Sequence, residues 1–130
     1  KPIIHIVEET VLSAKKKSPQ GAWMLSTVGT AQSGLYQNCA KKVNLPIFIP
    51  NEEQRKLIQE SIYKVKSNHI EEAGKIMKIV VHELWAQKDI LIMAACTEIP
   101  LSYAAADLPK EKEVSSLDAL ADACLKKLYS

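Results

Sequence analysis

The sequence has few of the residues that usually build a surface for nucleic acid or for a membrane. Arg55 is the only arginine among 17 basic residues, and the formal net charge is only +2. Arginine is the side chain best suited to phosphates and bases, and so small a charge attracts polyanions weakly. No apolar run approaches the roughly 20 residues that span a bilayer. We therefore expect neither nucleic acid nor a membrane as a partner.

Cysteine is also scarce. The chain has three, Cys39, Cys96 and Cys124, an odd number without a C-x-x-C pair. This usage indicates free thiols in a reducing compartment and predicts a cytoplasmic protein. The three histidines are scattered, and HELWA at 82–86 lacks the second histidine of a zinc-protease helix. The sequence therefore predicts no metal site.

Short apolar segments alternate with longer amphipathic ones along the 130 residues. The apolar segments predict buried strands at 22–26, 46–49 and 89–95, with a weaker strand at 112–115. The amphipathic segments predict helices at 7–17, 30–43, 52–66, 70–86 and 116–128. Strands that alternate with helices favour βαβ units and a parallel sheet covered on both faces. We expect an α/β three-layer sandwich with a mostly parallel four-stranded sheet.

The first strand ends in a segment that could bind an anion. Thr27 and Thr30 flank a tight Val28-Gly29 turn, and a helix is predicted to begin at Thr30. Ligands of open parallel sheets bind at the carboxyl ends of the strands. Backbone N–H groups at a helix start, with two hydroxyls nearby, suit a carboxylate or a phosphate. The alternative interpretation is ordinary capping, with Thr30 as the N-cap residue.

The third predicted strand ends in Cys96, and an acid, Glu98, follows two residues later. A helix beginning here would lower the pKa of the thiol through its dipole, whereas a nearby carboxylate would raise it. Such a pair suits proton transfer. The alternative is a buried structural cysteine with an acid in the first helical turn. Cys39 and Cys124 are expected to pack on helices.

Taken together, these motifs resemble the aspartate/glutamate (Asp/Glu/hydantoin) racemase superfamily, and within it the aspartate racemase branch. The resemblance rests on T-x-G-T and S-G-L-Y within 27–36 and on C-T-E-I-P at 96–100. Further similar segments are PIIHIVEET at 2–10, PNEEQRKLIQESIYKVKSN at 50–68 and VSSLDALADACLKKL at 114–128. The resemblance covers nearly the whole chain, but only the second half of the family's length.

The resemblance implies a particular domain organisation. Family members have two similar α/β lobes, and each lobe supplies one catalytic cysteine to a cleft between them. Residues 1–113 would form the second, C-terminal lobe, and residues 114–130 a C-terminal helix that packs back toward the absent first lobe. The chain begins at Lys1 rather than at methionine, so we expect either that something was removed or that this is a piece of a longer protein. The full-length protein is expected to be a homodimer.

The resemblance also implies a chemistry that uses neither pyridoxal phosphate nor a metal. One thiolate removes the α-proton of an amino acid related to aspartate or glutamate, and the opposite thiol reprotonates the other face. A carbanion of this kind needs preorganised donors in a site that excludes water.

The resemblance assigns roles to individual residues. Cys96 would be the second catalytic thiol, and Glu98 would assist it or bind the substrate ammonium. Thr27 would bind the substrate carboxylate or assist the thiol, with Thr30 nearby as a further binding residue. Lys66 would contact a substrate carboxylate. Thr97 would supply a backbone N–H group.

Two other interpretations stay open. A relative with the same fold could carry out arylmalonate-type decarboxylation, for which one cysteine suffices, or maleate isomerisation. The chain could instead be a non-catalytic binding or assembly module whose apolar cleft face needs a partner. Glu98 and Lys66 favour the amino-acid chemistry. Ala95 and Ser115 depart from the family pattern, which commonly has glycine and aspartate there.

Overall fold

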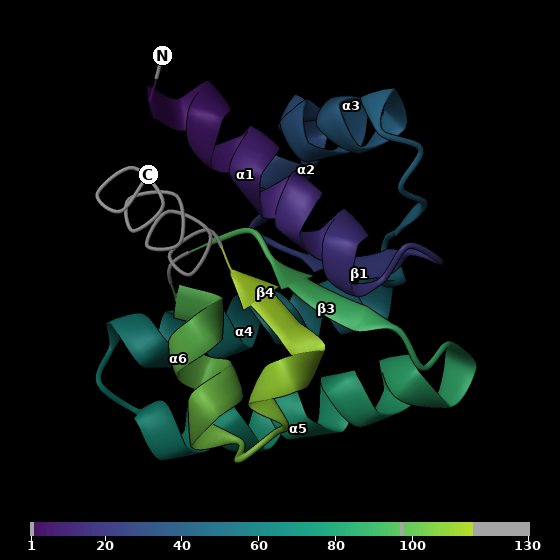
Figure 1. The fold of residues 1–130 in the computed structure, drawn as a ribbon. Helices are drawn as coiled ribbons and strands as arrows, with labels where there is room; N and C mark the ends of the chain where they lie inside the picture. Colours follow the sequence, from purple (N-terminus) through teal and green to yellow (C-terminus); the bar gives the residue numbers. More distant parts are fainter. Residues whose placement is uncertain (1, 97, 116–130) are drawn as a thin grey trace, which may run out of the picture.

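A computed structural model describes residues 2–96 and 98–115 as one parallel sheet between two layers of helices (Figure 1). The strands are β1 (Ala22–Leu25), β2 (Ile47–Phe48), β3 (Leu91–Ala94) and β4 (Glu113–Ser115). Their order in the sheet is β2-β1-β3-β4, and every neighbouring pair is parallel. The predicted α/β class, four-stranded sheet and weak last strand are confirmed. The helix predicted at 116–128 lies outside the described residues.

The two central strands are buried on both faces, as continuous apolar runs predict for a parallel sheet. Successive side chains of a strand point to opposite faces. Trp23 and Leu25 of β1 therefore join one core together with Ile92 of β3. Met24 and Met93 join the other core. The sheet thus separates two hydrophobic cores, each covered by its own helices.

The first core is covered by three helices. These are α4 (Glu52–Lys66), α5 (Ile70–Gln87) and α6 (Glu98–Ala105). Figure 1 shows them on one side of the sheet. Helix α4 begins with a capping box, in which Asn51 accepts from the Gln54 N–H at 2.8 Å and the Gln54 side chain accepts from the Asn51 N–H at 3.0 Å. The bounds predicted for α4 match the structure, because a cap and an amphipathic period both mark it.

The second core is covered by α1 (Pro2–Lys17) and α3 (Leu35–Lys42), with the short α2 (Val28–Ser33) before α3. Helix α1 begins earlier than the predicted residue 7. The single helix predicted at 30–43 is wrong, because Gly34 adopts a left-handed conformation (φ +71°) and separates α2 from α3. Thr27, not Thr30, is the N-cap residue of the first of these helices.

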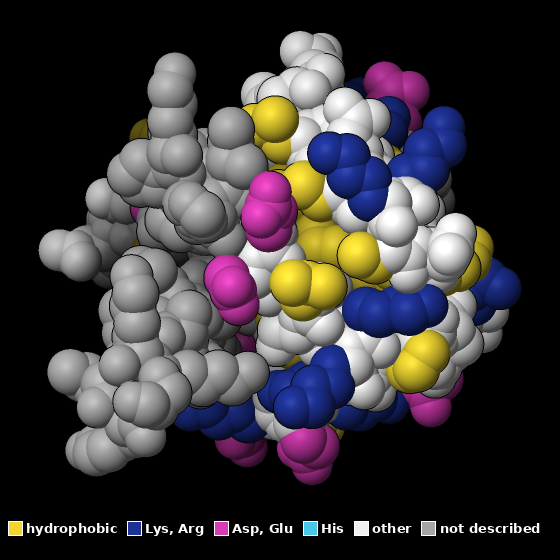
Figure 2. Space-filling view, turned by 45° about the horizontal axis from the view of Figure 1, so that its top comes forward, with side chains coloured by type: hydrophobic (Ala, Val, Ile, Leu, Met, Phe, Trp, Pro, Cys, Tyr) yellow, Lys and Arg dark blue, Asp and Glu magenta, His cyan; other side chains and the backbone are white. Residues whose placement is uncertain are grey.

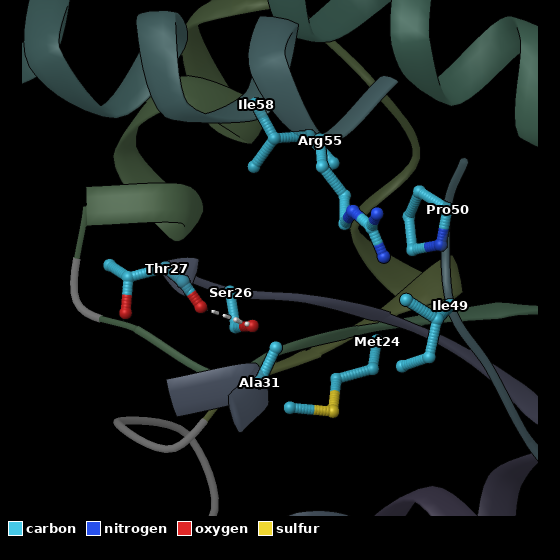
Figure 3. Close-up of a pocket in the computed structure, with 8 residues that line it drawn as sticks. All are labelled: Met24, Ser26, Thr27, Ala31, Ile49, Pro50, Arg55 and Ile58. Carbon is cyan, nitrogen blue, oxygen red and sulfur yellow. Dashed lines mark hydrogen bonds between the residues drawn. The ribbon is translucent and has the colours of Figure 1, made fainter. Parts of the chain in front are cut away.

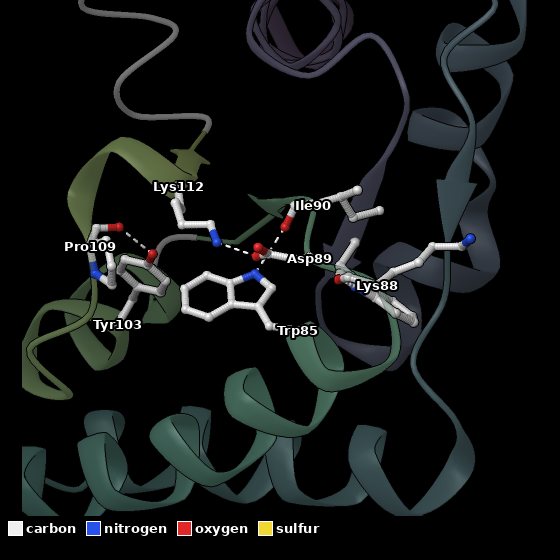
Figure 4. A network of polar contacts seen from close by, with 8 residues as sticks. Trp85, Lys88, Asp89, Ile90, Tyr103, Pro109 and Lys112 are labelled. Carbon is white, nitrogen blue, oxygen red and sulfur yellow. Dashed lines mark hydrogen bonds and ion pairs between the residues drawn. The ribbon is translucent and has the colours of Figure 1, made fainter.

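A network of polar contacts holds the amino-terminal edge of the sheet, at the start of β3 (Figure 4). The indole N–H of Trp85 donates to the Ile90 carbonyl at 2.9 Å. Lys112 pairs with Asp89, and its ammonium lies 4.2 Å from the centre of the Trp85 ring. These contacts join the end of α5 to the segment before β4.

Candidate active site

The carboxyl ends of β1 and β3 lie side by side at one edge of the sheet. Leu25 pairs with Ala94, and the Ala95 N–H donates to the Leu25 carbonyl at 2.8 Å. This register brings the segment that begins at Thr27 next to the segment that contains Cys96. The sequence predicted both strand ends as candidate sites, and the fold makes them neighbours.

Cys96 is partly buried between the end of β3 and the start of α6, against the first core. Burial is the largest influence on its thiol and raises the pKa above its usual value. The backbone N–H groups of Ile99 and Glu98 donate to the sulfur and act in the opposite direction. The Glu98 carboxylate raises the pKa further, whereas the Lys66 ammonium lowers it.

The balance of these effects corrects one expectation. The helix start acts on the thiol as predicted, through N–H groups that favour the thiolate. Desolvation is nevertheless stronger, so the pKa of Cys96 is raised rather than lowered. The thiol form is therefore the resting form of Cys96 near neutral pH in this chain.

Thr27 links the turn after β1 to the start of α2. Its hydroxyl donates to Thr30 Oγ1 at 3.0 Å and accepts from the Thr30 N–H at 3.2 Å. Both threonines are partly buried. The predicted pair of hydroxyls is therefore present at the strand end, with Thr27 both as the cap and as a wall of the site.

Three further predicted residues have different outcomes. Lys66, the last residue of α4, is exposed, and its ammonium acts on Cys96 from the end of that helix. Glu98 opens α6 and is partly buried beside the thiol. Thr97 lies outside the described residues.

Tyr36, in the S-G-L-Y motif, is a neighbour of Cys96 that the sequence analysis did not single out as a site residue. It is only 5 % exposed and lies in the first turn of α3. Burial raises the pKa of its phenol, the nearby Cys96 raises it further, and a hydrogen bond with Thr10 lowers it. The phenol therefore stays neutral and forms one wall beside the thiol.

Arg55 is a second residue that the sequence analysis did not assign to the site. It lines a small pocket that opens between the ends of β1 and β2 and the first turns of α4 (Figure 3). The other residues that line the pocket are Met24, Ser26, Thr27, Ala31, Ile49, Pro50 and Ile58. The sequence could have singled out Arg55 because it is the only arginine of the chain. Its position beside Thr27, however, depends on where α4 begins in the folded chain.

A separate hollow lies between α1 and α3, away from the strand ends. Figure 2 brings this end of the molecule forward and shows hydrophobic side chains gathered among lysines and acidic residues. The residues that line the hollow are Glu8, Val11, Leu12, Cys39, Lys42 and Val43. Cys39 thus packs beside α1, as predicted, and gives a matched control for experiments on Cys96.

The described part of the chain has neither a metal-binding cluster nor a membrane-spanning helix. Residues 2–96 and 98–115 contain no cluster of three histidine, cysteine or acidic side chains placed to hold a metal ion. Across the same two ranges, the length and hydropathy needed to cross a bilayer are not met by any helix.

Comparison with known proteins identifies the family. The sequence model of the Asp/Glu/Hydantoin racemase family matches residues 1–124. The chain belongs to this family. The predicted resemblance to the racemase superfamily is therefore confirmed, and so is the fold that it implied.

The chain is similar to one protein of known structure and to one further protein sequence. The aspartate racemase of Picrophilus torridus superposes with a TM-score of 0.73 at 25 % identity, over 94 % of this chain and 51 % of that one. An uncharacterized protein from the pnlA 3′ region of Pectobacterium carotovorum subsp. carotovorum is 27 % identical over 99 residues, which are 76 % of this chain and 66 % of that protein. The chain thus spans about half to two thirds of the length of these relatives.

Proposed function

We propose that this chain is the C-terminal lobe of a cofactor-independent amino-acid racemase and that Cys96 is one of its two thiol bases. The observation that carries the proposal is the position of Cys96 at the carboxyl edge of β3, with the Glu98 and Ile99 N–H groups on its sulfur. Family membership supports the racemase chemistry. The other thiol would come from a first lobe that closes the cleft.

The proposed reaction is a proton exchange without net redox change. In one direction, the thiolate of the other lobe takes the α-proton as the C–H bond breaks. The S–H bond of Cys96 then breaks and its proton forms the new C–H bond on the opposite face. The reverse direction uses Cys96 as the base. Two bases on opposite faces are needed because each thiol carries only one proton.

The neighbours of Cys96 match the two halves of this cycle. Burial keeps the thiol protonated and ready to donate. The N–H groups of Glu98 and Ile99, together with Lys66, favour the thiolate that forms after donation. These opposed influences bring the thiol and the thiolate of Cys96 closer in free energy. A residue that acts as an acid in one direction and as a base in the other needs such a balance.

The substrate of the proposed reaction is an amino acid related to aspartate or glutamate. Thr27 and Thr30 would hold the α-carboxylate through hydroxyl and backbone groups at the end of β1. Glu98 would pair with the α-ammonium beside the thiol. The similarity to an aspartate racemase supports this substrate class.

Replacement of Cys96 by serine tests the proposal in the native gene product. We expect Cys96→Ser to lower kcat for racemisation of the acidic amino acid by at least about 10³-fold, because a serine hydroxyl is a much weaker acid than a thiol. Chiral chromatography of the product measures the rate. Cys39→Ser, which removes a thiol between α1 and α3, should leave the rate unchanged. A Cys96→Ser enzyme within tenfold of wild type would contradict the proposal.

A further inference from the structure

The pocket that contains Arg55 has the chemistry of an anion site. Its polar side chains are one guanidinium and two hydroxyls, those of Arg55, Ser26 and Thr27, and none of its eight lining residues is acidic. Figure 3 shows the guanidinium reaching from α4 into the space between Pro50 and the end of β1. The planar guanidinium matches the two oxygens of a carboxylate, whereas the Ser26 and Thr27 hydroxyls donate within the chain, to the Thr27 carbonyl and to Thr30 Oγ1.

Among residues 2–96 and 98–115, Arg55 has no ion pair or hydrogen bond through its guanidinium. The ion pairs there use other cations, Lys64 with Glu72 and Lys112 with Asp89. The remaining walls of the pocket are apolar, among them Met24 and Ile58. Arg55 is itself an exposed residue, so solvent screens part of the attraction that its guanidinium exerts on an anion.

The start of α4 holds Arg55 in place. The capping box between Asn51 and Gln54 fixes the first turn, and the Gln54 amide also donates to Glu83 of α5 at 3.2 Å. Gln54 is buried, at 3 % exposure. Because Gln54, the residue before Arg55, is held by contacts on two sides, the backbone that carries the guanidinium is rigid. A rigid backbone lowers the entropy cost of binding.

The pocket is too small for a whole amino acid. Its free space, about 20 Å³ for the centre of a water-sized group, accommodates roughly one such group. That space takes about one carboxylate oxygen, so the pocket is a subsite and not a complete site. Since Thr27 lines it, the subsite adjoins the end of β1 on its β2 side, and the end of β3 lies one strand spacing (~4.8 Å) beyond β1.

Arg55 and Lys66 cannot hold the same carboxylate. They lie near opposite ends of α4, and their separation of eleven positions corresponds to about 16 Å along the helix axis. Lys66 acts on Cys96, whereas Arg55 lies at the far side of Thr27 from β3. A small dicarboxylate cannot reach both cations at once, so a second carboxylate bound by Arg55 would leave Lys66 to act on the thiol alone.

We propose that Arg55 is the specificity-determining residue of this chain and binds the second carboxylate of a dicarboxylic substrate in the pocket beside Thr27. This inference rests on the proposed function for the identity of the site. It goes further by naming the residue and the pocket that select the substrate. The second carboxylate would lie on the β2 side of β1, more than one strand spacing (~4.8 Å) from the thiol.

Binding of two achiral probes to the 130-residue chain tests this proposal without any racemisation. Succinate and butyrate have the same number of carbons, but only succinate carries two carboxylates. NMR titration should give a dissociation constant at least about tenfold lower for succinate, because a site built for a carboxylate discriminates against an analogue without it. Equal affinities for the two probes would overturn the proposal.

Matched variants separate the pocket from general electrostatics. Arg55→Gln should abolish the preference for succinate, and Arg55→Lys should keep part of it because the charge remains without the bidentate fork. Lys56→Gln removes the same charge from the next, exposed position of α4, outside the pocket, and should keep the preference. Equal losses in Arg55→Gln and Lys56→Gln would overturn the proposal. Circular dichroism checks folding, and Arg55→Lys decides the matter if Arg55→Gln does not fold.

The outcomes distinguish this inference from the proposed function. Succinate and butyrate have no stereocentre, so their binding is independent of catalysis. Arg55-dependent succinate binding in a protein that does not racemise would refute the racemase proposal and leave the subsite standing. Racemisation that depends on Cys96 but shows the same KM for the acidic amino acid in Arg55→Gln would refute the subsite alone.

Discussion

At the scale of single residues, the thiol of Cys96 is controlled by opposed and separable influences. Burial and the Glu98 carboxylate favour the neutral thiol, while two backbone N–H groups and Lys66 favour the thiolate. The side-chain influences can be removed one at a time without touching the cysteine. Thiol reactivity therefore reports directly on the arrangement of the site.

The pH dependence of Cys96 alkylation tests this arrangement. Only the thiolate reacts with iodoacetamide, so the rate rises as the pH passes the pKa. Because the pKa is raised, the midpoint should lie above that of an unperturbed thiol, near 8.5. Glu98→Gln should move the midpoint down, and Lys66→Gln should move it up. Mass spectrometry of the Cys96 peptide gives the rate at each pH.

Lys64→Gln is the control for Lys66→Gln. Lys64 is a lysine of the same helix that pairs with Glu72 at 3.0 Å and does not act on the thiol. Its removal should leave the midpoint in place. A Cys96 midpoint below 8.5, or equal shifts in Lys64→Gln and Lys66→Gln, would contradict the described arrangement.

The residues of the site were predictable to different degrees. Cys96, Glu98 and Thr27 follow strand ends, so local sequence and the resemblance to the family were enough to single them out. The direction of the Cys96 pKa was not predictable, because the desolvation that decides it comes from packing across the chain. Arg55 was missed because only the folded chain brings α4 against the end of β1.

At the scale of elements, the helices follow their local signals except after β1. The segment 30–43 has an apolar periodicity that runs through Gly34, so the sequence predicts one helix. The left-handed conformation of Gly34 ends α2 and restarts the chain as α3. This break lets the first turn of α3 carry Tyr36 toward Cys96. A glycine inside an amphipathic pattern therefore marked the break between two helices.

The packing of α5 against α6 depends on a second glycine. A Cβ atom at Gly74 would lie 2.7 Å from the carbonyl carbon of Ala105 and 2.8 Å from its oxygen. Such contacts force the two helices apart, because the obstacle is backbone and not a flexible side chain. Since α6 begins at the candidate site, this close approach also fixes the position of the helix start next to Cys96.

Gly74→Ala should therefore destabilise the chain by about 2 kcal/mol, the cost of overpacking less the gain in helix propensity. Urea unfolding followed by circular dichroism measures the change. Gly29→Ala is the matched control, because no heavy atom lies within 4 Å of the added Cβ. That variant should be at least as stable as wild type. Equal stability of the two variants would refute the close packing of α5 and α6.

At the scale of the whole molecule, the architecture was predictable because its signals are periodic and repeated. Apolar strands alternate with amphipathic helices, and this pattern admits few topologies other than a parallel sheet with helices on both faces. The fold and the family are confirmed. The division into residues 1–113 and 114–130, the first lobe and the homodimer stay predictions.

The same scale explains why one lobe is only half of the proposed catalyst. In the proposed reaction Cys96 serves one face of the substrate, and inversion needs a second acid or base on the other face. The chain spans 51 % of the Picrophilus torridus aspartate racemase chain that it resembles. The proposed two-thiol reaction therefore belongs to the native gene product, and the test of the account is made there.

The most direct test is solvent deuterium exchange by the native gene product in D₂O. Chiral chromatography with mass spectrometry measures the label in each enantiomer of aspartate and glutamate during the first turnovers. Two monoprotic bases deliver a solvent-derived deuteron to the product and leave the unreacted substrate unlabelled. We predict a product with one deuterium in the wild-type protein and no labelled product in Cys96→Ser. A product that keeps the original proton, or one whose labelling survives Cys96→Ser, would contradict the account.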